Sequence, residues 1–360
     1  MKKYHKNCQL IRHGLSFFED RISSCCYSPI DQIDGQNPPS LFSNYNGEII
    51  TKEQLFSRID EFSSIFVNGE TPFQCKGCFK IEEKDWELGE ERKFIDFITL
   101  SHYTICNAAC VYCSNNQVPE ERVTGNYDVF PILKSFKDSG VLKDGFELHL
   151  GGGEFSIYRE CDAILEEFGL SGFAKCCIAT SGIKYVDNFL NVLALGKSIM
   201  VVSLDSGCRE TYKRIKRVDA FDKVVENLKK YCSNPVARDN ITLKYILIPT
   251  INDNLTEFKK FLDIAKMLEI KYIAIDIEAR YLRTMNNEIE YYYYELANKM
   301  REVTKSYGCF WDIYFHSFLQ QTEEVIKQYK NKPFYGLFSF IKSRLNSKKI
   351  AKLYTVEKYI

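Results

Sequence analysis

Three closely spaced cysteines are the residues of this sequence best suited to chemistry. Cys106, Cys110 and Cys113 form a C-x3-C-x2-C run that contains no fourth cysteine. Three thiolates this close along the chain can hold an iron–sulfur cluster and leave one iron without a protein ligand. A structural zinc site would require a fourth ligand. The triplet therefore predicts a cluster with one open iron, to which a substrate or cofactor can bind.

A second group of cysteines precedes the triplet. Cys75 and Cys78 form a C-x2-C pair, and Cys8 and the adjacent Cys25 and Cys26 lie upstream of it. Four thiolates suit both a [4Fe–4S] cluster and tetrahedral zinc, so the number of ligands does not separate the two. Either metal would hold together a loop-rich segment that has too few apolar residues for a core of its own. The sequence predicts a metal-dependent amino-terminal module.

Composition limits the class of protein. The chain has 360 residues, of which 45% are hydrophobic and 14% aromatic, as in soluble globular proteins. Its 48 basic and 48 acidic side chains cancel, so no overall field favours nucleic acid. We find no signal segment and no apolar run near the roughly 18 residues of a membrane span, and we expect a cytoplasmic protein. In that reducing compartment, metal ligation or burial explains the 14 cysteines better than disulfides.

The elements that position the triplet follow residue 90, where short apolar runs alternate with helical stretches. Candidate strands span 94–100, 146–150, 176–180, 198–204, 241–248 and 272–277. Candidate helices include 222–231, 255–268 and 287–306. This alternation predicts an α/β fold with a parallel sheet.

Polar or glycine-rich runs lie at or just after the ends of five of these strands. They are the cysteine triplet, Gly-Gly-Gly-Glu at 151–154, Thr-Ser-Gly at 180–182, Ser-Leu-Asp-Ser-Gly at 203–207 and Pro-Thr-Ile-Asn-Asp at 249–253. In parallel α/β folds the loops that leave the carboxyl ends of the strands converge. We therefore expect all five runs to line one cavity.

The triplet, with Tyr112 just before its last cysteine, resembles the cluster motif of radical S-adenosylmethionine (SAM) enzymes. The resemblance implies a partial (β/α)6 TIM-like barrel in which three thiolates hold a [4Fe–4S] cluster and SAM chelates the fourth iron. It also implies that SAM is cleaved reductively to a 5′-deoxyadenosyl radical, which takes a hydrogen atom from the substrate.

Other runs resemble the SAM-binding motifs of this family. Residues 151–154 resemble its GGE motif: glycines let the chain approach a ligand closely, and a carboxylate suits the amino group of SAM. Thr180 begins a turn that resembles a Thr-Asn-Gly turn common in the family, and Ser203 and Asp205 stand at the ribose-contact positions. The implied cofactor-binding residues are Tyr112, Gly151, Gly152, Gly153, Glu154, Thr180, Ser203 and Asp205. For the SAM carboxylate, the choice between Lys216 and Arg217 stays open.

The amino-terminal cysteines resemble the auxiliary-cluster region called SPASM or twitch, although that region usually follows the barrel. The resemblance implies that Cys8, Cys25, Cys75 and Cys78 ligate a second [4Fe–4S] cluster. Cys26 is the alternative to Cys25, and zinc is the alternative metal. We expect three parts: this module at 1–90, a radical SAM core at 91–282, and a largely helical extension at 283–360.

By analogy with the family, the substrate is a small molecule, a sugar-type compound or a peptide, and a flavodoxin or ferredoxin supplies electrons. The basic tail at 327–360 is either a solvated helix face or a membrane-surface contact. The alternative function is that of a non-catalytic iron–sulfur or zinc protein in electron transfer or partner recognition. Glu154, Ser203 and Asp205 at the SAM-contact positions argue against that alternative.

Overall fold

The computed structural model describes residues 4–25, 40–72, 75–76, 78, 81–85, 93–113, 125–278 and 287–311. The chain divides into two compact units. Unit 1 contains residues 1–106 and 121–179, and unit 2 contains residues 107–120 and 180–360. The division falls inside the cysteine triplet, so Cys106 belongs to unit 1 and Cys110 and Cys113 belong to unit 2.

The strands of unit 1 run mostly in parallel. In spatial order they are β8 (Ala174–Thr180), β7 (Leu142–Leu150), β6 (Ile95–Leu100), β2 (Gly14–Phe17), β3 (Arg21–Ser23) and β4 (Ser40–Ser43). Pairing is parallel from β8 to β2 and antiparallel from β2 to β4. In β7 the buried Phe146, Leu148 and Leu150 alternate with the exposed Glu147 and the partly exposed His149. This period of two gives the sheet one apolar face.

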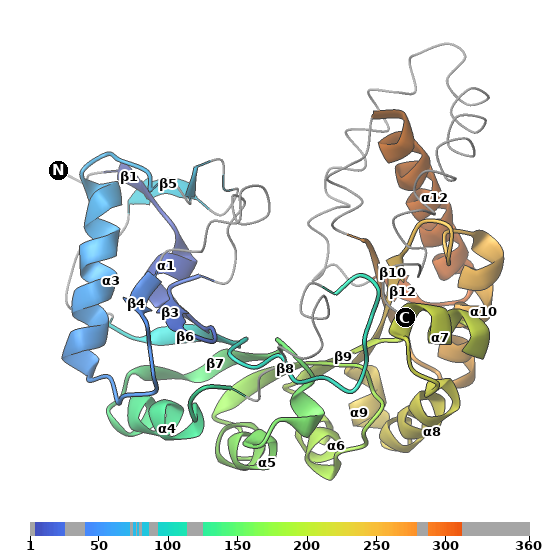
Figure 1. Cartoon of the computed structure of the whole chain (residues 1–360), viewed down its shortest axis with the longest axis horizontal. Coiled ribbons are helices and arrows are strands. Elements are labelled where there is room, and N and C mark those ends of the chain that lie inside the picture. Colours follow the sequence, from blue (N-terminus) through green and yellow to red (C-terminus); the bar gives the residue numbers. More distant parts are fainter. Residues whose placement is uncertain are drawn as a thin grey trace, which may run out of the picture. The chain divides into compact units, whose positions relative to one another are not determined.

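Helices cover the apolar face of this sheet. Figure 1 shows α4 (Phe130–Asp138) and α5 (Cys161–Ile164) on the same side of β6 and β7. Ile132, Leu133 and Phe136 of α4 are fully buried. Two short helical segments flank α5, a 3-10 helix η5 (Phe155–Ile157) and a π-helix η6 (Leu165–Leu170).

The amino-terminal region contains more regular structure than its composition predicts. Strands β1 (Tyr4–Asn7) and β5 (Glu82–Asp85) pair antiparallel, and α1 (Gln9–His13) follows β1. Helix α3 (Lys52–Val67) begins with a capping box and buries an apolar stripe. The prediction that this segment is loop-rich and has too few apolar residues for a core of its own is therefore wrong for the described residues. The boundaries at 90 and 282 remain a prediction.

Unit 2 contains four parallel strands, in the order β12 (Phe310–Trp311), β11 (Tyr272–Ile277), β10 (Ile241–Leu247) and β9 (Ile199–Ser203). All but one residue of β10 are buried, as in a strand covered on both faces. Its helices are α6 (Asp187–Ala194), α7 (Arg209–Lys216), α8 (Phe221–Cys232), α9 (Pro235–Asp239), α10 (Leu255–Met267) and α12 (Asn287–Ser306).

The α/β fold class and all six predicted strands are confirmed. Strand β7 begins four residues earlier than predicted, because Leu142 pairs with Ile95 before a register shift. Helix α12 has the predicted ends, whereas the basic tail at 327–360 lies outside the described residues. No helix in the described ranges is long and apolar enough to cross a membrane.

Candidate functional site

In unit 1, the glycine-rich run after β7 holds the segment that leads into Cys106. The amide of Gly153 donates a hydrogen bond of 2.9 Å to the carbonyl of Tyr103, and the amide of Glu154 donates one of 2.7 Å to the carbonyl of Ile105. The last carbonyl before Cys106 is thereby attached to the end of the neighbouring strand. The position of the first cysteine depends on this attachment.

Two of the three glycines are required by this close approach. A Cβ on Gly153 would lie 2.2 Å from the carbonyl oxygen of Ile105. Gly152 has a φ of +98°, and its Cβ would lie 2.9 Å from the Cα of Ser101. By contrast, a Cβ on Gly151 would meet nothing within 4 Å. Packing against the triplet segment accounts for Gly152 and Gly153, while the SAM contacts expected of the run remain a prediction.

A buried tyrosine lies close to both Glu154 and Cys106. Tyr103 is fully buried and stacks on Tyr158 with ring centroids 4.4 Å apart. Burial raises its pKa well above the usual value, and the charges of Glu154, Tyr158, Cys161 and Cys106 add to the shift. Its hydroxyl has no hydrogen-bond partner among the described residues. We did not predict this residue, and its only signal is its position three residues before Cys106.

Glu154 itself is only 2% exposed. Its carboxylate accepts a hydrogen bond of 3.2 Å from the amide of Ser156, at the start of η5. This is the geometry of a helix amino-terminal cap.

In unit 2, the carboxyl end of α7 holds the other two cysteines. The amide of Ala109 donates to the carbonyl of Lys216, and the amide of Val111 donates to the carbonyl of Ile215, both at 2.9 Å. The last carbonyls of a helix lack partners within the helix, and here the cysteine loop supplies them. The amide of Cys113 closes a turn onto the carbonyl of Cys110 at 3.1 Å.

Three polar side chains meet beside this loop. The Tyr112 hydroxyl donates to Asp205 Oδ2 at 2.6 Å, and Lys216 Nζ lies 2.8 Å from that hydroxyl and 2.5 Å from Asp205 Oδ2. The other oxygen of Asp205, Oδ1, accepts from the amide of Ile246 at 2.8 Å. Burial alone would lower the pKa of Lys216, but the Asp205 carboxylate raises it above the usual range.

The residues of unit 2 that we predicted to contact SAM differ in their burial and in their hydrogen bonds. Asp205 is fully buried with both carboxylate oxygens hydrogen-bonded inside the protein, whereas Ser203 ends β9 and is partly exposed. Lys216 points inward, whereas Arg217 is an exposed residue that ends α7 with a φ of 54°. Of the two basic residues, only Lys216 faces the loop of the cysteines.

The turn at 180–182 also reaches the triplet. Ser181 Oγ donates a hydrogen bond of 3.0 Å to Asn107 Oδ1, the residue after Cys106. Thr180 Oγ1 accepts from the amide of Gly182 at 3.0 Å, which holds the turn in shape.

Asn252 is a further organising residue that we did not predict as functional. Its side-chain amide donates to the carbonyls of Asp205 and Ile246, each at 2.8 Å, and its oxygen accepts from the amide of Ile248 at 2.7 Å. All three hydrogen bonds of its side chain go to backbone groups, so Asn252 fixes the loop after β10 against the backbone of Asp205. Its signal in the sequence was its place in the run at 249–253.

Three amino-terminal cysteines lie in one region of unit 1. Cys8 and Cys75 pack in the same apolar cluster with Ile11 and Phe66. Burial raises the pKa of Cys75 to about 12, and the charges of Cys78 and Cys8 add to the shift. Cys25 is buried just after β3, and Cys26 lies outside the described residues. Across the described part of the chain, no group of three potential ligands is arranged to hold a metal ion.

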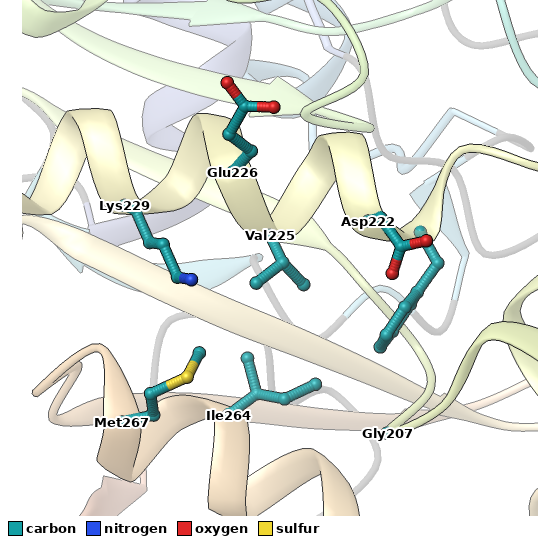
Figure 2. Close-up of a pocket in the computed structure, with 8 residues that line it drawn as sticks. Gly207, Asp222, Val225, Glu226, Lys229, Ile264 and Met267 are labelled. Atoms are coloured by element: carbon teal, nitrogen blue, oxygen red, sulfur yellow. The ribbon is translucent and has the colours of Figure 1, made fainter.

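A surface pocket of about 350 Å³ lies between α8 and α10. Figure 2 shows Val225 of α8 facing Ile264 and Met267 of α10 across it. Gly207, the last residue of the run at 203–207, lines the pocket, but none of the predicted cofactor-binding or metal-binding residues does.

The cysteine triplet follows a core strand of parallel α/β units, and a glycine-rich turn packs against the segment that leads into it. Residues 100–263 match the model of the Radical SAM superfamily.

Relatives and solved structures resemble parts of the chain. A probable GTP 3′,8-cyclase of Saccharolobus islandicus is 27% identical over 179 residues, which cover 49% of this chain and 54% of that protein. The GTP 3′,8-cyclase of Clostridium perfringens is 26% identical over 148 residues, covering 39% and 44%. The chain thus spans about half the length of these relatives. The structure of Streptococcus suis SuiB bound to S-adenosylmethionine has a TM-score of 0.45 and 13% identity, covering 73% of this chain and 61% of SuiB.

Proposed function

We propose that this protein cleaves SAM reductively at a [4Fe–4S] cluster held by Cys106, Cys110 and Cys113, and abstracts a hydrogen atom from a substrate. The observation that carries the proposal is the attachment of the triplet within the part of the chain that matches the Radical SAM model. Gly153 and Glu154 bind the segment before Cys106, and the end of α7 binds the loop of Cys110 and Cys113.

The number and type of these ligands support such a cluster, although the described residues hold no group of three ligands already arranged for a metal ion. All three cysteines are partly exposed, and three thiolate ligands leave one iron open. When bound, the cluster and SAM supply one-electron cleavage of the sulfonium and a 5′-deoxyadenosyl radical for hydrogen abstraction. The protein's part is to place the thiols and to bind SAM, for which Ser203 and the turns at 151–154 and 180–182 are the proposed contacts.

For the amino-terminal cysteines we keep the proposal of a second [4Fe–4S] cluster. Cys8 and Cys75 pack in one apolar cluster, and the charges of Cys78 and Cys8 help to raise the pKa of Cys75, which supports a shared site. Cys25 completes the proposed ligand set. Zinc is the competing metal, because four thiolates suit both.

The substrate class proposed from the sequence is a sugar-type compound or a peptide. The names of the two cyclases add GTP to the compounds to be assayed. We further propose a flavodoxin or ferredoxin as the electron donor and a cytoplasmic location.

Anaerobic reconstitution followed by dithionite reduction tests the proposed reaction. The readout is 5′-deoxyadenosine released from SAM, measured alone and with each candidate substrate. The control is a variant with Cys106, Cys110 and Cys113 all changed to Ala. Nucleoside from the parent chain and none from the variant supports the proposal. No nucleoside from a parent chain with a reducible cluster, under every substrate condition, contradicts it in favour of the non-catalytic iron–sulfur protein.

A further inference from the structure

We infer that Asp205, Lys216 and Tyr112 form a device that fixes the cysteine loop before any metal binds. We call these three residues the buried triad after the buried side chains of Asp205 and Lys216, whereas Tyr112 is partly exposed. The inference takes one point from the proposed function, namely that the cysteine loop is the site of a cluster. In it, Asp205 and Lys216 are positioning residues that act on the cysteines through Tyr112 and through the backbone of α7.

The buried triad joins three elements of unit 2. Asp205 lies just after β9, Lys216 is the last residue of α7, and Tyr112 lies between the second and third cysteines. The Tyr112 hydroxyl donates to Asp205 and lies within hydrogen-bond distance of Lys216. A single hydroxyl thus links the cysteine loop to both charged groups.

The charged pair is fully satisfied only with the loop in place. The side chains of Lys216 and Asp205 are 1% and 0% exposed, so water cannot replace a lost partner. A buried ion pair is tolerated when further hydrogen bonds complete it. Tyr112 supplies one such bond to each member of the pair. Displacing the loop would therefore leave both charges short of a partner.

Lys216 holds the loop twice. Its side chain lies 2.8 Å from the Tyr112 hydroxyl, and its backbone carbonyl accepts from the amide of Ala109. The preceding residue, Ile215, accepts from Val111 and belongs to an apolar cluster against which Val111 and Tyr112 pack. The loop is therefore attached through both backbone and side chain over residues 109–112.

This assignment differs from the roles that the family resemblance implied. There, Asp205 contacts the ribose of SAM and Lys216 is a candidate for its carboxylate. In the structure both groups face each other and Tyr112. Their effect on chemistry passes through the geometry of the thiols, so it is present without SAM.

Amide hydrogen exchange of residues 107–113 in the metal-free chain tests the buried triad. Tyr112→Phe removes only the hydroxyl and keeps the packed ring. We expect it to speed exchange of the Ala109 and Val111 amides roughly tenfold, the effect of losing about one hydrogen bond to a charged group. Exchange in β7 of unit 1 should stay unchanged. Equal exchange in the Tyr112→Phe and parent chains would overturn the inference.

Two further variants distinguish positioning from general destabilisation. Lys216→Met should speed exchange at 107–113 by at least as much as Tyr112→Phe, and Lys216→Arg should restore part of the protection because it keeps the charge. Lys213→Met, on an exposed position of the same helix, is the matched control and should change nothing. If Lys216→Met unfolds the whole chain, amide exchange in Tyr112→Phe still tests the inference.

Iron retention then separates this inference from the proposed function. In reconstituted protein, Tyr112→Phe should lose iron to a chelator roughly tenfold faster than the parent chain, by the same loss of one hydrogen bond. Changed exchange without any cluster would sustain the buried triad and defeat the proposed function. The opposite outcome is a parent chain that cleaves SAM but has the same amide exchange and iron loss as Tyr112→Phe. That outcome would support the proposed function and contradict the role of the buried triad.

Discussion

Lys216 and Asp205 form an ion pair at the meeting point of α7 and the loop after β9, with Nζ 2.5 Å from Oδ2 and almost no exposure of either side chain. The pair lies directly under Tyr112, which stands between two cysteines of the triplet. Tyr112 therefore links the buried Lys216–Asp205 ion pair to the loop that carries the cysteines.

Removing the cation should destabilise the fold strongly. Lys216→Met leaves the Asp205 carboxylate buried without its charged partner, which costs about 3–5 kcal/mol of the free energy of unfolding. Urea denaturation measures this loss. Adding Asp205→Asn should recover part of it, because the two side chains interact directly. Lys213→Met should stay within about 0.5 kcal/mol of the parent chain. Equal stabilities of Lys216→Met and Lys213→Met would show that the ion pair is absent in solution.

The glycines after β7 should differ sharply in their tolerance of a methyl group. Gly153→Ala places a Cβ against the carbonyl of Ile105, and we expect a loss of about 1–3 kcal/mol in stability together with less iron on reconstitution. Gly151→Ala meets open space and should behave as the parent chain. Thermal unfolding and iron content measure both effects. A Gly151→Ala variant as impaired as Gly153→Ala would point instead to a ligand contact at Gly151.

His102 should make the protein sensitive to acid. Burial lowers the pKa of its ring from 6.5 to about 3, with Arg159 adding to the shift. Between these two values the unfolded chain binds a proton that the folded chain does not. Stability attributable to His102 should therefore fall as pH drops below 6.5, by up to about 1.4 kcal/mol per pH unit.

Urea midpoints across this range test the effect. His102→Gln should flatten the dependence, because the ring that takes up the proton on unfolding is gone. An identical slope in the parent chain and His102→Gln would contradict the assignment.

The order of elements from residue 94 to 277 could be predicted because it follows from local pattern. Strand β11 carries the predicted ends, and β10 is an apolar run of the kind typical of covered strands. Helix α3 was missed although its buried residues Leu55, Phe56, Ile59 and Phe66 follow helical spacing, because the prediction for this region rested on composition. The pairing of β2 with β6 connects residues about eighty positions apart, and local pattern does not encode such a contact.

For the site, the sequence located the cysteines and the strand-end runs but not the interactions among them. Asp205 was recognised by its place after β9, yet its partner on α7 depends on how that helix ends. Lys216 and Arg217 are adjacent and of like charge, and only their burial in the fold shows that Lys216 points inward and Arg217 does not. Tyr103 gave no pattern at all, because its role comes from burial next to the triplet.

The amino-terminal cysteines should bind metal together. Cys75→Ser combined with Cys78→Ser should remove one metal site and lower the thermal midpoint, since metal binding and folding are coupled in such segments. Metal analysis by mass spectrometry decides between iron and zinc. Cys177→Ser, on β8, is the control and should retain all metal. Unchanged metal content in the Cys75, Cys78 variant would remove this second site from the proposal.

Electron paramagnetic resonance of the Cys75→Ser, Cys78→Ser variant, reduced without oxygen and recorded before and after addition of SAM, tests the central claim most directly. In this background only the triplet should hold a cluster. We expect about four irons per chain and a spectrum that changes when SAM reaches the open iron. A reducible cluster whose spectrum is the same with and without SAM would contradict a SAM-binding site at Cys106, Cys110 and Cys113.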